Sequence, residues 1–467
     1  MGIKLKCKKA KNMVDNKLFF IIEQVSQLSS SELDDTLCTS QFIKNLPKAD
    51  IHVHLPGTIS PRTAWELGVR NGLIKWKNGE WTFSPLSSKN PHKSYSEIFK
   101  NFESIRYEKD PDVSVLKYAV ISRDFSSFDR IMATVQGHRY PPGGIQNEND
   151  LWLVLQNYLK QCIKDNIIYT EVQQNIRIAY AIYPSLSHQE ARFRLYDLFS
   201  RAAHLFQCQG IVLRFLNCFN KTDSSNLQQS TQQRSAEAAQ WLDEAEAYFP
   251  NLFVGLQSAG AETCPQAAPM KLTPGYRYAY DKGFGCEAHA GEGTGFLYLS
   301  QTLKTLPIQR IAHGFQAIEH LPTIHEIQEK NITLVMAPAI NLILGASLHQ
   351  YSGLKKIGKT MINSLDGHPF FSLFRHHKLS VTLSSDNPQM GGTSLQNTML
   401  LLSGFPSDED SELSHVKSSP LTLKEVIQLN VEAIVSSFAD ASTKVLLLNR
   451  VLGYLLEFYR LGRRKVK

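Results

Sequence analysis

The chain has 467 residues, of which 42% are hydrophobic and 20% are charged, and its formal net charge is +7. This composition is typical of an ordinary soluble globular protein with a large core. Basic residues concentrate only at the two tips, MGIKLKCKKAK and LGRRKVK, so solvated termini explain the charge and no nucleic-acid-binding surface is indicated.

No run of about 18 apolar residues occurs, which excludes a membrane-spanning helix. The apolar run LFFII at 18–22 is too short for a signal peptide, since Glu23 follows at once. The seven cysteines are widely spaced and form no CxxC pair, which favours a reduced compartment over a disulfide framework. The sequence therefore predicts a cytoplasmic protein, and export by a non-classical route stays open.

A barrel is predicted over residues 48–467, after an N-terminal helical extension over 1–47. Eight short β-branched runs, each followed by loop residues and a longer helical stretch, occupy the middle of the chain. The runs lie at 49–55, 166–176, 210–219, 252–260, 284–292, 310–315, 333–340 and 379–388. This alternation predicts βα units around a parallel sheet, and eight strands are the number that closes a (β/α)8 TIM-type barrel.

The segment between the first two runs is much longer than the others, so an insertion is expected within about 64–165. It contains GHRYPPGGIQNEND at 137–150, which is too long for a mere connection and indicates a functional loop or an insertion. After the last run, amphipathic stretches over 421–440 and 441–461 are expected to form closing helices.

Two histidines lie one residue apart in ADIHVHL at 49–55. Because side chains alternate along a strand, Asp50, His52 and His54 are expected to share one face. Pro56 and Gly57 end the strand directly after the histidines. Since catalytic groups of barrels gather at the carboxyl ends of the strands, both imidazoles are predicted to lie at the barrel mouth.

Two further candidates end later runs, His289 in EAHAGE and Asp386 in TLSSDNP. Neutral imidazoles and carboxylates are the usual ligands of a catalytic zinc ion, which keeps one position for water. The first, fifth and eighth strands would bring these groups together. The sequence thus predicts a metal site, with His52, His54, His289 and Asp386 as the candidate ligands.

Glu292 and His313 complete the predicted site. Zinc lowers the pKa of a bound water to about 7, and a nearby imidazole such as His313 can take its proton. Glu292 lies just beyond His289 and could protonate a basic ring nitrogen of the substrate. Considered one at a time, the two residues have alternative interpretations: Glu292 as a solvated loop carboxylate and His313 as a hydrogen-bonded core histidine.

Nine segments in this order resemble the adenosine deaminase family of metal-dependent hydrolases. They are KADIHVHLPGTISP, YTEV, VGLQSAGAE, EAHAGE, IAHGF, APAINLILGA, HPFFSLF, VTLSSDNP and LNVEAIVSSF. The resemblance implies a (β/α) barrel with one zinc ion per chain, held by His52, His54, His289 and Asp386. It also implies that Glu292 protonates purine N1 and that His313 orients or deprotonates the attacking water. Attack at C6 would expel ammonia and give an inosine-type product. The backbone N–H of Gly260 would contact purine N3, and Asn387 would donate to N7.

Three positions depart from the family pattern. Pro56 stands where the family often has an Asp that binds the ribose 5′-hydroxyl, and a proline side chain offers no acceptor. Loss of that carboxylate leaves room for a phosphate, which basic residues of the 137–150 loop could bind. Asn387 and Gln257 also stand where the family has Asp.

The expected partner is therefore a small-molecule purine nucleoside or nucleotide, with an adenosine-type nucleoside as the first choice. A deaminase of AMP or N6-substituted AMP is the closest alternative. A non-catalytic, adenosine-deaminase-like binding protein and a different zinc hydrolase are the alternatives from other classes. Many two-metal members of the superfamily use a carboxylated lysine on the fourth strand to bridge the two ions. The corresponding run here, LFVGLQSAG, contains no lysine, so the resemblance favours a single metal ion. The sequence does not define an oligomeric state.

Overall fold

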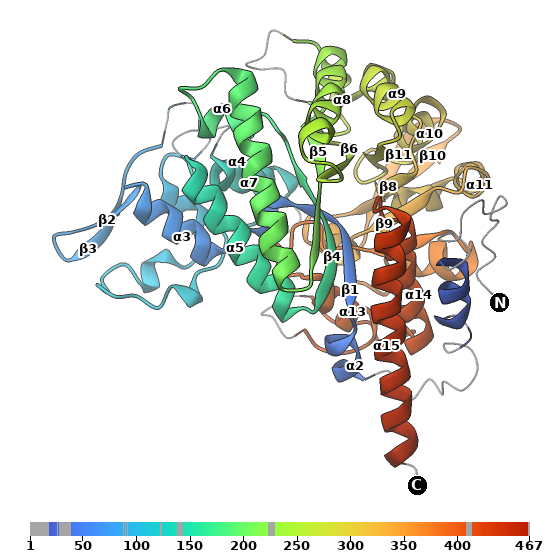
Figure 1. Ribbon diagram of the computed structural model, residues 1–467. Coiled ribbons are helices and arrows are strands. Elements are labelled where there is room, and N and C mark those ends of the chain that lie inside the picture. Colours follow the sequence, from blue (N-terminus) through green and yellow to red (C-terminus); the bar gives the residue numbers. More distant parts are fainter. Residues whose placement is uncertain are drawn as a thin grey trace.

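An eight-stranded parallel sheet forms the centre of the computed structural model, with helices around it (Figure 1). The structure describes residues 18–25, 27, 39–86, 88, 90, 92–121, 124–137, 143–222, 229–407 and 413–465. The strands, in their order in the sheet, are β1 (Lys48–His54), β4 (Ile167–Gln174), β5 (Val212–Asn220), β6 (Phe253–Ala259), β7 (Gly285–Ala290), β8 (Arg310–His313), β9 (Thr333–Met336) and β12 (Val381–Leu383). Each predicted run overlaps one of these strands, so the predicted (β/α)8 fold class is confirmed.

The first and last strands close the barrel through the backbone of Asp386. The amide of Asp386 donates to the carbonyl of His52 at 3.0 Å, and the amide of His54 donates to the carbonyl of Asp386 at 2.8 Å. Val53 and Asp386 thereby form a parallel bridge just beyond β12. The seam of the barrel therefore runs through three of the predicted metal ligands.

After the helical residues 18–25, the described part of the chain forms fourteen further α-helices. They are α2 (Ser40–Asn45), α3 (Pro61–Arg70), α4 (Phe125–Gln136), α5 (Glu148–Lys164), α6 (Ile178–Ile182), α7 (His188–Cys208), α8 (Thr231–Tyr248), α9 (Thr273–Asp281), α10 (Phe296–Thr305), α11 (Leu321–Glu329), α12 (Pro338–Ile343), α13 (Leu395–Leu402), α14 (Leu423–Ser436) and α15 (Ala441–Lys465). Capping boxes begin α7, α8 and α14, where a Ser or Thr side chain and the Glu or Gln three residues later satisfy backbone N–H groups.

The segment between β1 and β4 carries α3, α4, α5 and a two-stranded hairpin of β2 (Ile74–Lys77) and β3 (Glu80–Phe83). Figure 1 shows this hairpin on the far side of the segment from the barrel. Of the predicted 137–150 loop, residues 138–142 lie outside the described part of the chain, and its last three residues belong to α5. Arg139, the arginine of this loop that is a candidate for phosphate binding, falls in that undescribed stretch.

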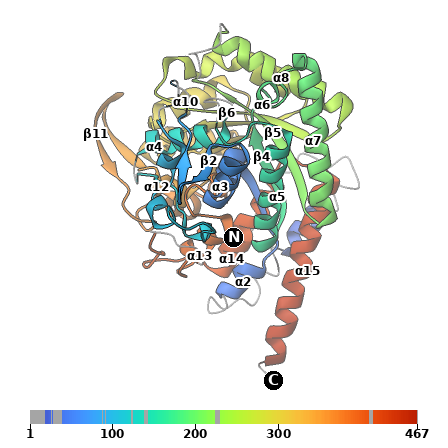
Figure 2. The same ribbon diagram turned by 90° about the vertical axis from the view of Figure 1, so that its left-hand side faces the viewer.

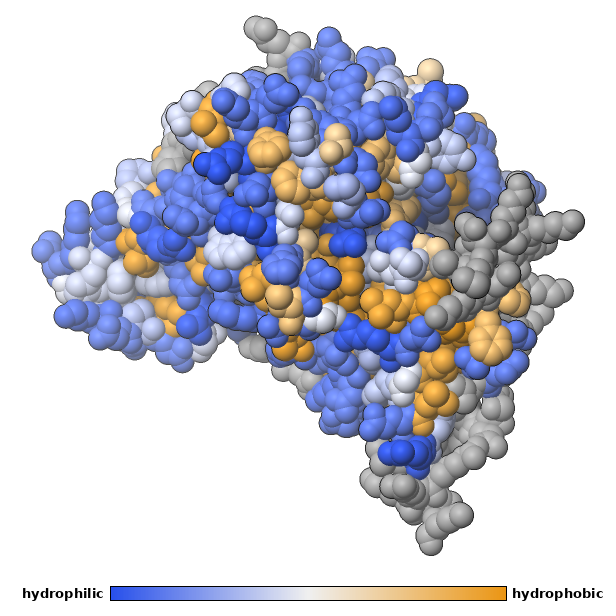
Figure 3. Space-filling model, in the orientation of Figure 1, coloured by the Kyte–Doolittle hydropathy of each residue, from blue (hydrophilic) through white to orange (hydrophobic). Residues whose placement is uncertain are grey.

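The two ends of the described chain pack together. Phe42 of α2 lies 4.8 Å from Phe458 and 5.4 Å from Tyr454 of α15, measured between ring centroids. Figures 1 and 2 show the end of α15 extending away from the barrel, and Figure 3 shows hydrophobic side chains along this helix. Residues 18–25 are helical, whereas 1–17 and 28–38 of the expected extension lie outside the described residues. In the part of the chain that is described, no helix has both the length and the apolar character needed to cross a bilayer.

The barrel interior contains a fully buried arginine between two buried carboxylates. Arg310 of β8 lies with Nη1 2.7 Å from Glu171 of β4 and with Nε 2.7 Å from Glu287 of β7. Its guanidinium also packs on the ring of Phe438, 3.7 Å from the centroid. Glu171 accepts hydrogen bonds from the Tyr169 hydroxyl and the Phe438 amide, each at 2.6 Å. These two ion pairs thus connect strands β4, β7 and β8 inside the barrel.

Replacing Arg310 by methionine is expected to destabilise the fold by about 3–5 kcal/mol, because two buried carboxylates lose their shared cation. Chemical denaturation followed by circular dichroism measures the free energy of unfolding. Arg201→Met is the matched control, since Arg201 pairs with Glu148 and Asp197 at the surface and should change stability little. Equal unfolding free energies for the two variants would contradict this account of the barrel interior.

Candidate functional site

Four side chains at the barrel mouth form a compact group of ligand atoms. His52, His54, His289 and Asp386 are all buried, and the nearest nitrogen or oxygen atoms of the four lie within 4.8 Å of one another. The Nε2 atoms of His54 and His289 are 3.3 Å apart, and Asp386 Oδ1 is 3.4 Å from Nε2 of both His52 and His54. The structure therefore brings together the four residues that the sequence predicted as ligands.

Two atoms of this group are buried without a hydrogen-bond partner, His52 Nε2 and Asp386 Oδ1. Buried polar atoms are rarely left unpaired, because the lost hydration is not recovered. A cation placed between the four side chains would satisfy both atoms at once. Three imidazoles and one carboxylate are a donor set that suits a divalent transition metal, so the group fits a metal site.

The protonation states of three of the ligands suit metal binding. Burial lowers the pKa of His54 to about 4 and the pKa of His289 well below its usual value. Both imidazoles are therefore neutral near pH 7, which is the form that binds a metal. Burial alone would raise the pKa of Asp386, but its contact with His52 and the neighbouring histidines lower it to about 2.

His52 differs from the other ligands because carboxylates flank it on both sides. Burial alone would lower its pKa, yet contacts with Glu287 and Asp386 outweigh burial and raise it to about 10. The two carboxylates thus favour a positive charge at this ring. A metal on Nε2 would supply that charge in place of a proton.

Glu287 holds the other side of the His52 ring. Its Oε1 lies 2.6 Å from His52 Nδ1, and the Gln173 amide donates to the same oxygen at 3.0 Å. A carboxylate behind a ligating histidine orients the ring and makes it a stronger ligand. Glu287 was not among the site residues predicted from the sequence. It lies two residues before His289 on the same strand, and the strand alternation places both side chains on one face.

Gln257 of β6 contacts Nδ1 of His289, and the Ser258 carbonyl lies 3.0 Å from the same nitrogen. Nε2 of His289 is thereby left facing His54 and the rest of the group. The sequence marked Gln257 only as a departure from the family pattern. The structure shows that it lies against a predicted metal ligand and helps to set its orientation.

Backbone geometry at the mouth is unusual for non-glycine residues. Asp386 has φ 57° and His313 has φ 65°, both in the left-handed region. Such conformations cost free energy and cluster at functional sites. Gly57 lies so close to Asn387 that an added Cβ would be 2.3 Å from Asn387 Oδ1. The turn after β1 therefore requires glycine at position 57. This close packing holds Asn387, the predicted contact to purine N7, next to the predicted ligand Asp386.

Glu292 and His313 face each other near the group. His313 Nε2 lies 3.6 Å from Glu292 Oε1, and the His313 ring centroid is 5.1 Å from that of His289. The Asn341 amide lies 3.1 Å from His313 Nδ1 and so orients the ring, a contact that the sequence did not predict. Burial raises the pKa of Glu292, which keeps a proton on this carboxyl more readily than on an exposed one.

Gly260 directly follows β6 and has φ 106°, a conformation that favours glycine. A Cβ there would lie 2.6 Å from Asn220 Oδ1 at the end of β5, so the turn leaves no space for a side chain. The backbone after β6 therefore runs close to the neighbouring strand end at the barrel mouth.

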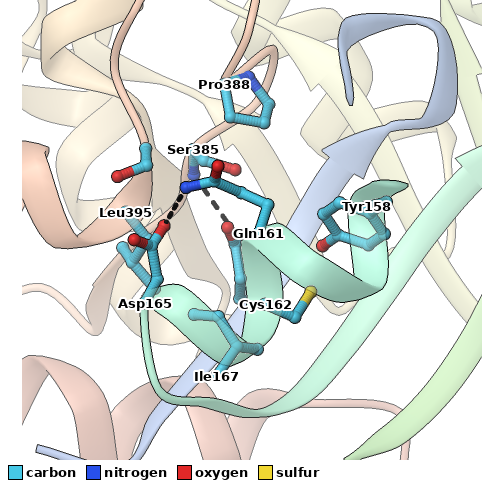
Figure 4. Close-up of a pocket in the computed structure, with 10 residues that line it drawn as sticks. Tyr158, Gln161, Cys162, Asp165, Ile167, Ser385, Pro388 and Leu395 are labelled. Carbon is cyan, nitrogen blue, oxygen red and sulfur yellow. Dashed lines mark hydrogen bonds between the residues drawn. The ribbon is translucent and has the colours of Figure 1, made fainter. Parts of the chain in front are cut away.

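Asp50 does not share the environment of His52, contrary to the simple alternation that the sequence predicted. Asp50 lines a small cavity with Tyr158 and Cys162 of α5, and the amide of Ser385 donates to Asp50 at 3.2 Å. Figure 4 shows this cavity, with Tyr158, Cys162 and Ser385 among its labelled residues. The pairing of β1 with β4 shifts register between Asp50 and Val53, which interrupts the alternation. Asp50 thus supports the backbone next to Asp386 from behind.

Comparisons with known proteins agree with this geometry. The family model described as adenosine deaminase matches residues 111–454. An adenine deaminase of Chlorobium phaeobacteroides is 23% identical over 414 residues, which cover 87% of this chain and 95% of that protein. The crystal structure of an adenine deaminase from Arthrobacter aurescens gives a TM-score of 0.61 at 19% identity, covering 88% of this chain and 99% of that one.

A second similar structure is an amidohydrolase from Burkholderia ambifaria with bound Zn. Its TM-score is 0.61 at 17% identity, and the match covers 92% of this chain and 96% of that one. At such identities the solved structures support the barrel fold. The family match spans most of the sequence, from the segment before α4 into α15, and the chain belongs to the adenosine deaminase family.

Proposed function

We propose that this chain is a zinc-dependent hydrolase that removes the 6-amino group of an adenosine-type purine nucleoside, giving an inosine-type product and ammonia. The observation that supports it best is the buried group of three imidazoles and one carboxylate beside the Glu292–His313 pair. Both halves of a hydrolytic deaminase site are present, which argues against a non-catalytic binding protein.

His52, His54, His289 and Asp386 would hold the zinc ion. When bound, zinc supplies Lewis acidity that makes water a nucleophile near neutral pH. Glu287 holds His52 and Gln257 holds His289, so the chain orients two of the ligands from behind. The four candidate ligands come from β1, from β7 and from the turn just beyond β12, and Gln257 comes from β6.

Glu292 acts as the acid in this proposal. Because burial raises its pKa, it carries a proton more readily than an exposed glutamate near neutral pH. Proton transfer from Glu292 to purine N1 would draw electrons from C6 and make that carbon open to attack. His313, oriented by Asn341, lies where it can orient the water and accept its proton. The backbone N–H of Gly260 would bind N3, and the Asn387 amide would bind N7.

Free adenine is a second candidate substrate. The similar Chlorobium and Arthrobacter proteins are named adenine deaminases. Pro56 lies buried in the turn after β1 and offers no side-chain acceptor for a ribose hydroxyl. A 6-aminopurine without ribose requires no such acceptor. AMP and N6-substituted AMP are the phosphorylated alternatives, and they share the chemistry at C6.

A cytoplasmic setting is part of the proposal. Five cysteines among the described residues are free, namely Cys162, Cys208, Cys218, Cys264 and Cys286. Free thiols suit a reducing compartment. The expected partner there is a small purine rather than a macromolecule.

A substrate panel tests the proposal. The zinc-loaded protein is incubated with adenosine, deoxyadenosine, adenine, AMP and N6-methyl-AMP, and the loss of ultraviolet absorbance and the release of ammonia or methylamine are followed. Adenosine is expected to have the highest kcat/KM. A higher value for adenine would transfer the proposal to the free base, and a metal-bound protein without turnover of any panel member would refute it.

Glu292→Gln is expected to lower kcat about 10²- to 10⁴-fold, because the amide cannot deliver the proton to N1. Its metal content should equal that of the unchanged protein, since Glu292 is not one of the clustered ligands. Steady-state kinetics and elemental analysis of the same preparation measure both quantities. Full activity in this variant would contradict the assignment of Glu292 as the acid.

Asp386→Ala is expected to lose both bound metal and turnover, because one of four ligands is removed. Asp366→Ala is the matched control: this exposed carboxylate only accepts hydrogen bonds from Lys417 and Ser418, so its metal content should not change. Elemental analysis after dialysis against a weak chelator compares the two variants. Equal zinc in both would show that Asp386 is not a ligand.

A further inference from the structure

One carboxylate holds the start of the loop that follows β7. Glu262 accepts hydrogen bonds from the amide of Glu292 at 3.2 Å and from the amides of Gly293 and Thr294 at 3.3 and 3.1 Å. The Thr294 hydroxyl donates to the same carboxylate at 2.5 Å. Four donors from three consecutive residues thus converge on Glu262, and one of them is the backbone of the proposed acid.

Glu262 itself belongs to a different loop, the one that follows β6. It lies two residues after Gly260, whose backbone is confined to a left-handed conformation against Asn220. The hydrogen bonds of Glu262 therefore join the loop that carries Gly260 to the loop that carries Glu292. In the proposed complex these two residues contact N3 and N1, the two ring nitrogens on either side of C2.

Among the described residues, the other side chains that hold the β7 loop contact its far end. Gln316 Oε1 accepts from the amide of Gly295 at 2.6 Å, and Glu319 Oε2 accepts from the amide of Phe296 at 3.0 Å. Both contacts lie where the loop enters α10. The end that carries Glu292 is held by Glu262.

We infer that Glu262 is a positioning residue for the deamination, and that it sets the spacing between the acid at N1 and the backbone donor at N3. The inference rests on the proposed function. It adds to that function a residue that touches neither the metal group nor the reacting atoms. A fixed spacing aligns the Glu292 carboxyl with N1 before the reaction, and displacement of a catalytic group by about 1 Å can cost a factor of about 100 in rate.

The charge of Glu262 acts on Glu292 as well. Four charged or titratable side chains surround Glu292: His313, Asp386, Glu262 and Lys221. Burial is the main reason that the pKa of Glu292 is raised. The two carboxylates raise it further, while His313 and Lys221 oppose them. Removing the negative charge of Glu262 should therefore lower the pKa of the acid.

Two substitutions separate position from charge. Glu262→Gln removes the negative charge and one of the two acceptor oxygens. Glu262→Asp keeps the negative charge but shortens the side chain by one methylene group. Both are expected to lower kcat about 10- to 100-fold with a smaller change in KM, because alignment at N1 matters most in the transition state. In Glu262→Gln the alkaline limb of the pH–kcat profile should also move to lower pH. In Glu262→Asp that limb should stay in place.

Glu190→Gln is the matched control. Glu190 also accepts a hydrogen bond from a backbone amide, that of Ser187, but it does so in the capping box at the start of α7. It should leave kcat and the pH profile unchanged. Hydrogen–deuterium exchange of residues 292–294, metal content and melting temperature are measured for all variants. Faster exchange in this loop with unchanged metal content is expected for both Glu262 variants.

The inference is overturned if the unchanged protein turns over a 6-aminopurine and Glu262→Gln keeps its kcat and pH profile. It is also overturned if kcat falls in Glu262→Gln while the alkaline limb stays in place, because Glu262 would then only stabilise the fold. If the unchanged protein deaminates no member of the panel, the proposed function fails and the inference falls with it. The first two results leave the proposed function intact, so the failures are distinguishable.

Discussion

Closure of the barrel at Asp386 is the interaction on which the rest of the site depends. The amide and carbonyl of this residue hydrogen-bond to the backbone of His52 and His54 across the seam between the first and last strands. The same residue places its carboxylate within 3.4 Å of both imidazoles. Because one residue makes the backbone closure and contributes a candidate ligand atom, the four candidate ligands come together only in the closed barrel.

The charges behind the metal group follow from that closure. Glu171, Arg310, Glu287 and His52 form a buried row across strands β4, β8, β7 and β1. Glu171 and Glu287 carry one negative charge more than Arg310 neutralises, and Asp386 adds another. Positive charge at the mouth would balance this excess. A divalent cation at that position is consistent both with the unpaired atoms of His52 and Asp386 and with this local charge balance.

The loop that follows β7 is held by side chains from neighbouring loops. Glu262 holds the start of the β7 loop, while Gln316 and Glu319 hold its end. Glu319 also accepts from the amide of His349 at 2.7 Å, at the base of the hairpin formed by β10 (Ser347–Ser352) and β11 (Lys355–Met361). The loop with Glu292 is therefore coupled to three neighbouring segments, which suits a group that must meet a substrate atom in one orientation.

The sequence by itself determined the strands, their number and the types of residue at their ends. The alternation of side chains along a strand can be read from local sequence, and parallel strands of a barrel all end at one face. These two rules were enough to predict the candidate site residues His52, His54, His289, Asp386, Glu292 and His313. Only the tertiary structure decided the partners behind them. Glu287, Gln257 and Asn341 act on residues of other strands, and Glu262 acts on another loop, so their contacts depend on register and on barrel closure. Asp50 shows the limit of the local pattern, because an irregular pairing of β1 with β4 turns it toward α5. Pairing between distant strands is a property of the whole barrel, and no spacing within one segment encodes it.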